Sequence, residues 1–292
     1  MSMKDIWTNR TTPTISFEFF PAHDEKATQK LDKVIDTLAA LEPDFVSVTF
    51  GAGGSTREGS YQLVEKLKWD KKLEVLPYVA AYGLGQEELV SVLENYQQLG
   101  IENVFCVRGD HPEAEDFVPQ PDSLTHASDF LSFVGERYDF IKGAAGYPEG
   151  HKEAVNLDQD LEYLQLKVKQ GAEFIITQYC YDNRIFFDFV ERCRSIGIHV
   201  PIVAGIMPIY SIKMMENLAT LCGATIPQFL QEKLALLPAD DKEAVPNFGI
   251  QFVLEQCHEL MSHGVEGLHF YTMDRAKTIE QVVKQLRFEG KV

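Results

Sequence analysis

The chain has 292 residues, of which 45% are hydrophobic and 24% are charged, a length that suits two ordinary domains or one α/β barrel. Its formal net charge of −17 argues against nucleic acid or an anionic membrane as the main partner, although a locally basic cleft can still bind an anion. The sequence has no apolar run of membrane-span or signal-peptide length, no CxxC pair among its five cysteines and no two histidines at metal-ligand spacing, so we expect a cytoplasmic protein with reduced cysteines and no metal site.

The first predicted strand, Ile15–Phe20, carries one carboxylate among aromatic residues. Successive side chains of a strand point to opposite faces, so Glu18 lies on the face opposite Phe17 and Phe19. Burial favours the protonated form of a carboxyl group, which makes Glu18 a candidate proton donor near neutral pH. The alternative is a structural glutamate that is paired or that meets water at the end of the strand.

Short apolar runs alternate with amphipathic stretches along the whole chain. Leu31, Val34, Ile35 and Leu38, for example, have the i, i+3, i+4, i+7 spacing of a helix. Eight such strand–helix units predict a single domain over residues 1–292 that folds as a closed (β/α)8 TIM barrel, with a doubly wound open sheet as the alternative. The predicted strands are Ile15–Phe20, Phe45–Phe50, Glu74–Ala80, Asn103–Val107, Phe140–Ala145, Phe174–Gln178, Pro201–Gly205 and Gly267–Tyr271.

The glycine-rich segment Gly51–Thr56 follows the second strand and superficially matches a dinucleotide-binding fingerprint. Thr56 stands where the last glycine of GxGxxG is needed, and no acidic residue ends a second strand about twenty residues further on. We therefore interpret this segment as a flexible loop at the mouth of the barrel.

Two later segments interrupt the alternation of strands and helices. Residues 110–127 are rich in proline and acidic residues and predict a long loop after the fourth strand. Residues 206–266 are too long for one crossover helix, and they predict extra helices between strands 7 and 8, at 211–222, 226–237 and 244–263.

Polar residues recur at the carboxyl ends of the predicted strands. In a barrel these ends and the loops that follow them form the functional face, so the residues are expected to converge on one rim. They are Glu18, Thr49, Arg108 with Asp110, Tyr147 with His151, Gln178 and Arg275.

From about Ser16 to Leu286 the chain resembles the 5,10-methylenetetrahydrofolate reductases, in the short bacterial form without a regulatory domain. One matching segment alone would be weak, but all of them in order and at barrel spacings are specific. The segments are Ser16–Pro21 (SFEFFP), Phe45–Ala52 (FVSVTFGA), Val107–Asp110 (VRGD), Ala127–Asp129 (ASD), Ala144–His151 (AAGYPEGH), Ile176–Gln178 (ITQ), Gly205–Pro208 (GIMP) and His269–Arg275 (HFYTMDR).

The resemblance implies an enzyme with a non-covalent FAD at the mouth of the barrel. NADH or NADPH reduces the flavin and leaves. Methylenetetrahydrofolate then takes its place and accepts the hydride, becoming the 5-methyltetrahydrofolate used in methionine synthesis. The family also tends to assemble, which implies a homo-oligomer.

The resemblance also assigns roles to individual residues. Glu18 matches the general acid, which delivers a proton to N10 so that the folate ring opens to a 5-iminium cation. Asp110 matches a carboxylate that stabilises developing positive charge, although a Gly-Asp-x-Pro sequence also suits a turn. Gln178 matches the glutamine that contacts the pterin, and Tyr271 and Arg275 are further candidates for substrate contact.

The resemblance implies twelve positions that line FAD, and nine of them match the family. Tyr78, His126 and Tyr163 depart from the residues usual there, which are His, Tyr and Asn. Met214 and Leu218 depart from a Gln and a Phe that contact the nucleotide or the folate, so the choice between NADH and NADPH stays open. The expected FAD positions are Thr49, Tyr78, Arg108, Gly109, Asp110, His126, Ala127, Tyr147, His151, Asp160, Tyr163 and Lys167.

Two other functions remain as alternatives at the level of sequence. One is a folate-binding methyltransferase barrel that needs no flavin and passes a methyl group to a corrinoid. The other is a flavin-binding subunit without turnover.

Overall fold

The computed structural model describes residues 3–9, 11–51, 57–110, 117–238 and 240–292. Eight parallel strands pair in sequence order and close into a barrel, which confirms the predicted (β/α)8 fold and excludes the open sheet. The strands are β1 (Thr14–Phe19), β2 (Phe45–Val48), β3 (Val75–Ala80), β4 (Asn103–Val107), β5 (Ile141–Gly146), β6 (Phe174–Thr177), β7 (Ile202–Ile206) and β8 (Gly267–Tyr271).

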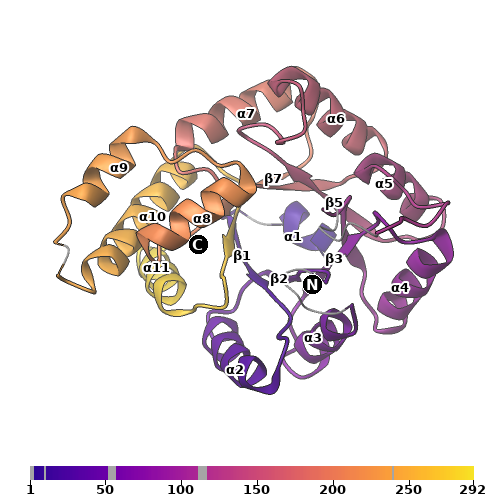
Figure 1. Ribbon diagram of the computed structural model, residues 1–292, viewed down its shortest axis with the longest axis horizontal. Helices are drawn as coiled ribbons and strands as arrows, with labels where there is room; N and C mark the ends of the chain where they lie inside the picture. The colour runs from indigo at the N-terminus through magenta and orange to yellow at the C-terminus, as the bar shows by residue number, and fades with distance from the viewer. Residues whose placement is uncertain (1–2, 10, 52–56, 111–116, 239) are drawn as a thin grey trace.

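Helices surround this barrel, as Figure 1 shows. The stripe predicted from Leu31, Val34, Ile35 and Leu38 is buried against the strands, which confirms that helix. The helices are α1 (Met3–Asn9), α2 (Glu25–Ala39), α3 (Arg57–Trp69), α4 (Gln86–Gln98), α5 (Ala127–Gly135), α6 (Leu157–Lys169), α7 (Asn183–Ser195), α8 (Ile212–Cys222), α9 (Gln228–Ala235), α10 (Ala244–Ser262) and α11 (Lys277–Phe288).

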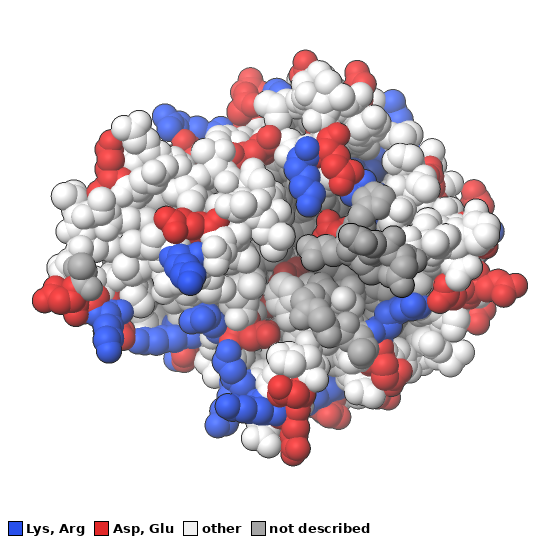
Figure 2. Space-filling view, in the orientation of Figure 1, with Lys and Arg blue, Asp and Glu red and all other residues white. Residues whose placement is uncertain are grey.

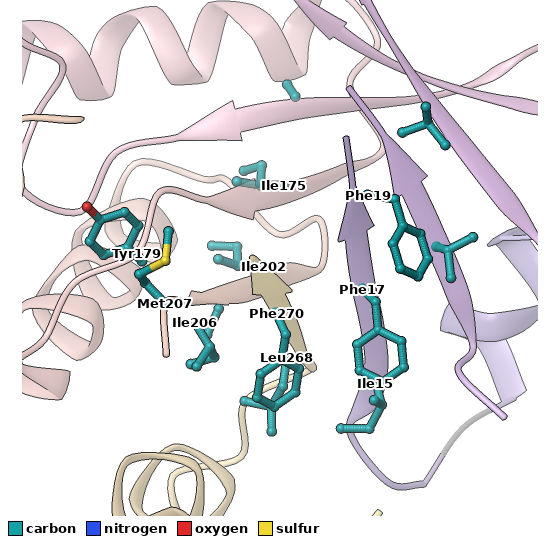
Figure 3. Close-up of a cluster of buried hydrophobic side chains, with 14 of the residues drawn as sticks. Ile15, Phe17, Phe19, Ile175, Tyr179, Ile202, Ile206, Met207, Leu268 and Phe270 are labelled. Carbon is teal, nitrogen blue, oxygen red and sulfur yellow. The ribbon is translucent and has the colours of Figure 1, made fainter. Parts of the chain in front are cut away.

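The alternation of side chains along β1 determines which of them enter the apolar layer and which point into the barrel. Ile15, Phe17 and Phe19 project from one side of the strand into the apolar layer, which Figure 3 shows together with residues of β7 and β8. Phe17 packs against Phe270 of β8 with 6.1 Å between ring centroids. Glu18 therefore has to point to the other face, into the barrel.

The extra helices between β7 and β8 are confirmed as α8, α9 and α10, and they extend the molecule on one side in Figure 1. The Ser211 hydroxyl caps α8 by accepting a hydrogen bond from the Met214 backbone N–H. Gly223 ends the helix with φ 72°, a left-handed conformation that favours glycine.

Helix α1 is absent from the sequence prediction. Met3 and Ile6 are buried against Phe45 and Phe174, the first residues of β2 and β6. The Trp7 ring lies 5.9 Å from that of Phe174. The helix thus covers the amino ends of the strands, opposite the expected functional face, and a seven-residue helix with few apolar positions gives little periodic signal.

We expect Ile6→Ala to lower the free energy of unfolding by about 2–4 kcal/mol, because it leaves a cavity between α1 and the floor of the barrel. Urea unfolding measures the change. Leu236→Ala is the matched control, since Leu236 is 85% exposed and its truncation removes little packing. Equal effects of the two substitutions would contradict the packing of α1 against the barrel.

Some sequence predictions concern residues whose placement is not described. Residues 52–56 of the Gly51–Thr56 loop and residues 111–116 of the predicted loop 110–127 lie outside the described residues, while 117–126 contain neither helix nor strand, as predicted. Among the described helices, none is long and apolar enough to cross a membrane. Within the described ranges there is also no cluster of three His, Cys, Asp or Glu side chains that could hold a metal ion.

Candidate functional site

A pocket of about 260 Å³ opens at the carboxyl ends of β4 and β5 and against α5 and α6. It brings together eight of the twelve positions expected to line a flavin. We call it the cationic pocket, because four of its side chains are cations or potential cations, namely Arg108, His126, His151 and Lys167. The expected residues that line it are Arg108, His126, Ala127, Tyr147, His151, Asp160, Tyr163 and Lys167.

Lys167 and Asp160 are seven residues apart on α6, so they share one face of the helix, as predicted. The Lys167 ammonium donates a hydrogen bond to the Ala145 carbonyl at 2.5 Å and lies 5.6 Å from the centroid of the Tyr147 ring. Burial lowers the pKa of Lys167 to about 8, and the Asp160 carboxylate opposes that shift. The lysine is held in place by the protein before any ligand binds.

Arg108 has a partner that the sequence did not indicate. Its guanidinium donates two hydrogen bonds to the Glu153 carboxylate, at 2.5 and 2.7 Å, and this pairing raises the pKa of Arg108. Glu153 also lines the cationic pocket. The only sequence signal was its place two residues after His151, in the loop that follows β5.

His151 and Tyr147 form the wall of the pocket on the β5 side. Their rings meet edge to face with 4.7 Å between centroids. Burial lowers the pKa of His151 and raises that of Tyr147 to about 12, so both rings are neutral at pH 7. A neutral imidazole offers one donor and one acceptor to a ligand.

Glu18 lies inside the barrel near its mouth and is only 4% exposed. Burial raises its pKa to about 8, a hydrogen bond from Tyr78 opposes the rise, and the charge of Asp274 adds to it. The Thr272 hydroxyl fixes the strand here by donating to the Glu18 backbone carbonyl at 2.6 Å. The carboxyl group is therefore protonated at neutral pH, as the pattern of β1 predicted.

Asp274, which lies near Glu18, is another residue that sequence analysis missed. Its carboxylate accepts a hydrogen bond from the Phe20 backbone N–H at 3.5 Å, which brings the loop after β8 over the end of β1. Because 254 residues separate the two positions in the sequence, nothing local in the chain indicated that Asp274 helps to keep Glu18 protonated.

The candidate substrate residues Gln178 and Tyr271 lie at the carboxyl ends of β6 and β8, the two strands that flank β7. The Tyr271 hydroxyl donates to the Thr177 carbonyl at 2.8 Å, and its pKa is raised by burial and by the nearby Glu18 and Tyr147. The Gln178 side-chain oxygen accepts from the Tyr179 backbone N–H at 3.1 Å, and the amide NH₂ makes no hydrogen bond to any of the described residues. Tyr271 thus stands between the acid and the cationic pocket.

Other predicted residues lie further from the acid. Asp110 is 90% exposed and its carboxylate is 4.0 Å from the Lys152 ammonium, so it faces solvent. Gly109 has φ 91°, and a Cβ there would lie 2.9 Å from the Cβ of Ala80, so the turn requires glycine. The Arg275 guanidinium lies 5.2 Å from the centroid of the Tyr210 ring.

The remaining predicted positions are buried or lie on α8. The Thr49 hydroxyl is buried and has no hydrogen-bond partner among the described residues. Met214 and Leu218 are partly buried one turn apart on α8. On the face shown in Figure 2, basic side chains alternate with acidic ones around the rim and do not form one positive region.

Comparison with known proteins gives consistent results. The sequence matches the profile of the family described as methylenetetrahydrofolate reductase over residues 3–287. It is 34% identical over 263 residues to 5,10-methylenetetrahydrofolate reductase of Escherichia coli, covering 90% of this chain and 87% of that protein. It is also 34% identical over 291 residues to methylenetetrahydrofolate reductase (NADH) 1 of Arabidopsis thaliana, covering 96% of this chain.

The chain spans about half the length of the eukaryotic relatives it matches, 49% for the Arabidopsis protein and 46% for methylenetetrahydrofolate reductase 1 of Schizosaccharomyces pombe. Among solved structures, it resembles an uncharacterized protein from Clostridium thermocellum that binds two copies of 5-methyl-5,6,7,8-tetrahydrofolic acid. The TM-score is 0.68 at 16% identity, and the match covers 99% of this chain and 100% of that one, which supports the barrel fold.

Proposed function

The chain belongs to the methylenetetrahydrofolate reductase family, and we propose that it uses NADH or NADPH to reduce 5,10-methylenetetrahydrofolate to 5-methyltetrahydrofolate by ping-pong hydride transfer through FAD. The observation that carries the proposal is Glu18, a buried carboxyl group with its pKa raised to about 8 at the mouth of the barrel. Such a group is an acid matched to neutral pH. The product would supply methyl groups for methionine synthesis.

The cationic pocket fits the polar part of FAD. Arg108, Lys167 and His151 are side chains suited to diphosphate and ribityl oxygens. The Thr49 hydroxyl, which has no hydrogen-bond partner among the described residues, offers a further donor or acceptor. The flavin, when bound, supplies the chemistry of accepting a hydride from the nicotinamide nucleotide and passing it to the folate. In the Clostridium neighbour, the same fold binds a methylated folate.

Glu18 performs the proton transfer that the folate step requires. The methylene carbon is held between N5 and N10 in a five-membered ring, so a proton on N10 is needed before the ring opens to the 5-iminium cation. The neutral carboxyl can give up this proton, directly or through water, and the resulting carboxylate lies where it stabilises the cation. Gln178 and Tyr271 border the same space and are proposed to orient the pterin.

The folate half-reaction is expected to slow as the pH rises, because only protonated Glu18 is an acid. Its pKa is raised above the usual value, so the active form predominates below about pH 8 and is lost above it. Beyond that midpoint the rate should fall about tenfold per pH unit. Stopped-flow reoxidation of the reduced enzyme by methylenetetrahydrofolate across this range provides the measurement, and a rate that increases through the midpoint would contradict the assignment.

Asp110→Asn is expected to slow the folate half-reaction more than the nucleotide half-reaction, since its charge would favour a cation on the folate. The effect should be about tenfold, because water screens a side chain this exposed. Single-turnover rates of the two half-reactions give the comparison. If both fall equally, Asp110 serves the turn or the flavin and not the folate cation.

The colour of the purified protein tests the proposed function against its alternatives. Yellow protein that bleaches anaerobically with NADH or NADPH and regains colour with methylenetetrahydrofolate is the reductase. Colourless protein that binds no added FAD would favour the methyltransferase. Yellow protein that never bleaches would favour a binding subunit.

The proposal also covers the domain organisation, cellular location and oligomeric state of the enzyme. We propose that residues 1–292 act as one catalytic domain, that the protein works in the cytoplasm and that it forms homo-oligomers. Steady-state rates with each nucleotide would decide between NADH and NADPH, which Met214 and Leu218 leave open.

A further inference from the structure

Gln178 is a partly exposed residue in a buried segment of the chain. Within residues 174–181 every other residue is buried, and its neighbours Thr177 and Tyr179 are only 1% and 2% exposed. The Gln178 backbone N–H donates to the Gly146 carbonyl at 2.8 Å, which ties the start of the loop after β6 to the end of β5. The residues that follow Gln178 are held by a different element.

Helix α10 holds this loop from the helical side. Gln256 Nε2 donates a hydrogen bond to the Cys180 carbonyl at 2.8 Å. In the opposite direction, Asn183 Nδ2 at the start of α7 donates to the Gln256 backbone carbonyl at 3.0 Å and to the Glu259 carboxylate at 2.7 Å. We call Gln256, Asn183 and Glu259 the loop clamp, because they join the two ends of the loop to one turn of α10.

The loop clamp lies in an interface that is otherwise largely apolar. Gln256 and Asn183 are 7% and 5% exposed. Phe252, which is four residues before Gln256 and so shares its face of α10, packs on Tyr181 with 6.4 Å between ring centroids. Apolar contacts tolerate small shifts, whereas buried hydrogen bonds require one alignment, since an unpaired buried polar group is costly. The clamp therefore fixes the loop relative to the helix.

The course of this loop determines where the Gln178 amide points. The amide oxygen accepts from the Tyr179 backbone N–H at 3.1 Å, so the side chain is held by the main chain directly after it. Cys180, whose carbonyl Gln256 holds, is the next residue. A shift of the main chain at Cys180 would turn the Tyr179 N–H and with it the amide of Gln178.

We propose that Gln256 is a positioning residue for the folate, which holds the Cys180 carbonyl and so keeps the Gln178 amide directed at the pterin. Asn183 and Glu259 support it by fixing the start of α7 on the same turn of α10. The inference rests on the proposed function, in which Gln178 orients the pterin. It makes the affinity for folate depend on a residue of the outer helical layer.

Gln256→Met tests the proposal, because it removes the donor and keeps a side chain of similar length in the interface. The concentration of methylenetetrahydrofolate that half-saturates reoxidation of the reduced holoenzyme should rise about 3–10-fold, the value of one hydrogen bond to a ligand. The limiting rate at saturating folate and the affinity for FAD should stay near their wild-type values, since only binding of the pterin is weakened.

A double-mutant cycle with Gln178→Ala shows whether Gln256 acts through Gln178. If it does, adding Gln256→Met to Gln178→Ala should leave the half-saturating concentration unchanged, because the amide that it positions is already absent. Two effects that multiply would show that Gln256 acts independently of Gln178 and would overturn the proposal. Asn183→Ala should give a smaller rise in the same direction, and it carries the test if Gln256→Met does not fold.

Gln251→Met is the matched control, because Gln251 is exposed on the same helix and the substitution is the same. It should leave the half-saturating concentration at the wild-type value. A wild-type value in Gln256→Met as well would overturn the inference, as would a lower limiting rate with unchanged half-saturation. A wild-type protein that does not reduce methylenetetrahydrofolate would instead show that the proposed function itself is wrong.

Discussion

Glu18→Gln is expected to abolish most folate reduction while reduction of the flavin by the nucleotide continues. The amide has nearly the same size and still accepts a hydrogen bond from Tyr78, so the barrel should keep its structure. It has no acidic proton for N10, and loss of a positioned acid typically costs about 10²–10⁴-fold in rate. The nucleotide half-reaction needs no such proton.

Anaerobic stopped-flow measurement of each half-reaction separates the two effects. Glu191→Gln is the matched control, because this glutamate is exposed on α7 and away from the barrel mouth. An equal loss of both half-reactions in Glu18→Gln would contradict its role as the folate acid. So would retention of most folate reduction.

Lys167→Ala is expected to weaken FAD binding strongly. The substitution removes a cation from the cationic pocket and leaves the buried Asp160 carboxylate facing an anionic diphosphate. Loss of a hydrogen bond to a charged group costs about 1.5–3 kcal/mol, which corresponds to roughly 10–150-fold in the dissociation constant. The protein should be purified with little colour.

Lys169→Ala provides a close control for this substitution. Lys169 lies on the same helix but is exposed and donates to Gln165 at 2.7 Å. Fluorescence titration of flavin-free protein with FAD compares the two. The wild-type affinity should also weaken above about pH 8, because FAD prefers the charged lysine and that charge is lost as pH rises through the pKa. Equal affinity in both variants would place the diphosphate elsewhere.

Most strands were predictable because they are short, mainly apolar runs buried on both faces, as parallel strands are, although β5 is only partly buried. The predicted Asn103–Val107 and Gly267–Tyr271 match β4 and β8 without a change of boundary. Helices α8 to α10 were predictable from the length of the segment between β7 and β8. Helix α1 was not, because burial of so short a helix depends on a floor that the distant strands build.

The candidate site was predictable only where a local pattern carried it. The alternation in β1 placed Glu18 inside the barrel, and the seven-residue spacing placed Asp160 and Lys167 together. The pairing of Arg108 with Glu153 and the approach of Asp274 to Glu18 join positions 45 and 256 residues apart, which no local pattern encodes. Asp110 is the opposite case. Its sequence matches the family, but a sequence match does not reveal that the side chain faces solvent.

The protonation state of Glu18 is the central claim, and infrared difference spectroscopy of the carboxyl group tests it most directly. Spectra of wild type minus Glu18→Gln across the pH range isolate the band of the protonated acid. The band should be present at neutral pH and disappear with a midpoint of about 8. A Glu18 that is already ionised in mildly acidic solution, at the pH usual for an exposed carboxyl, would contradict its assignment as the acid.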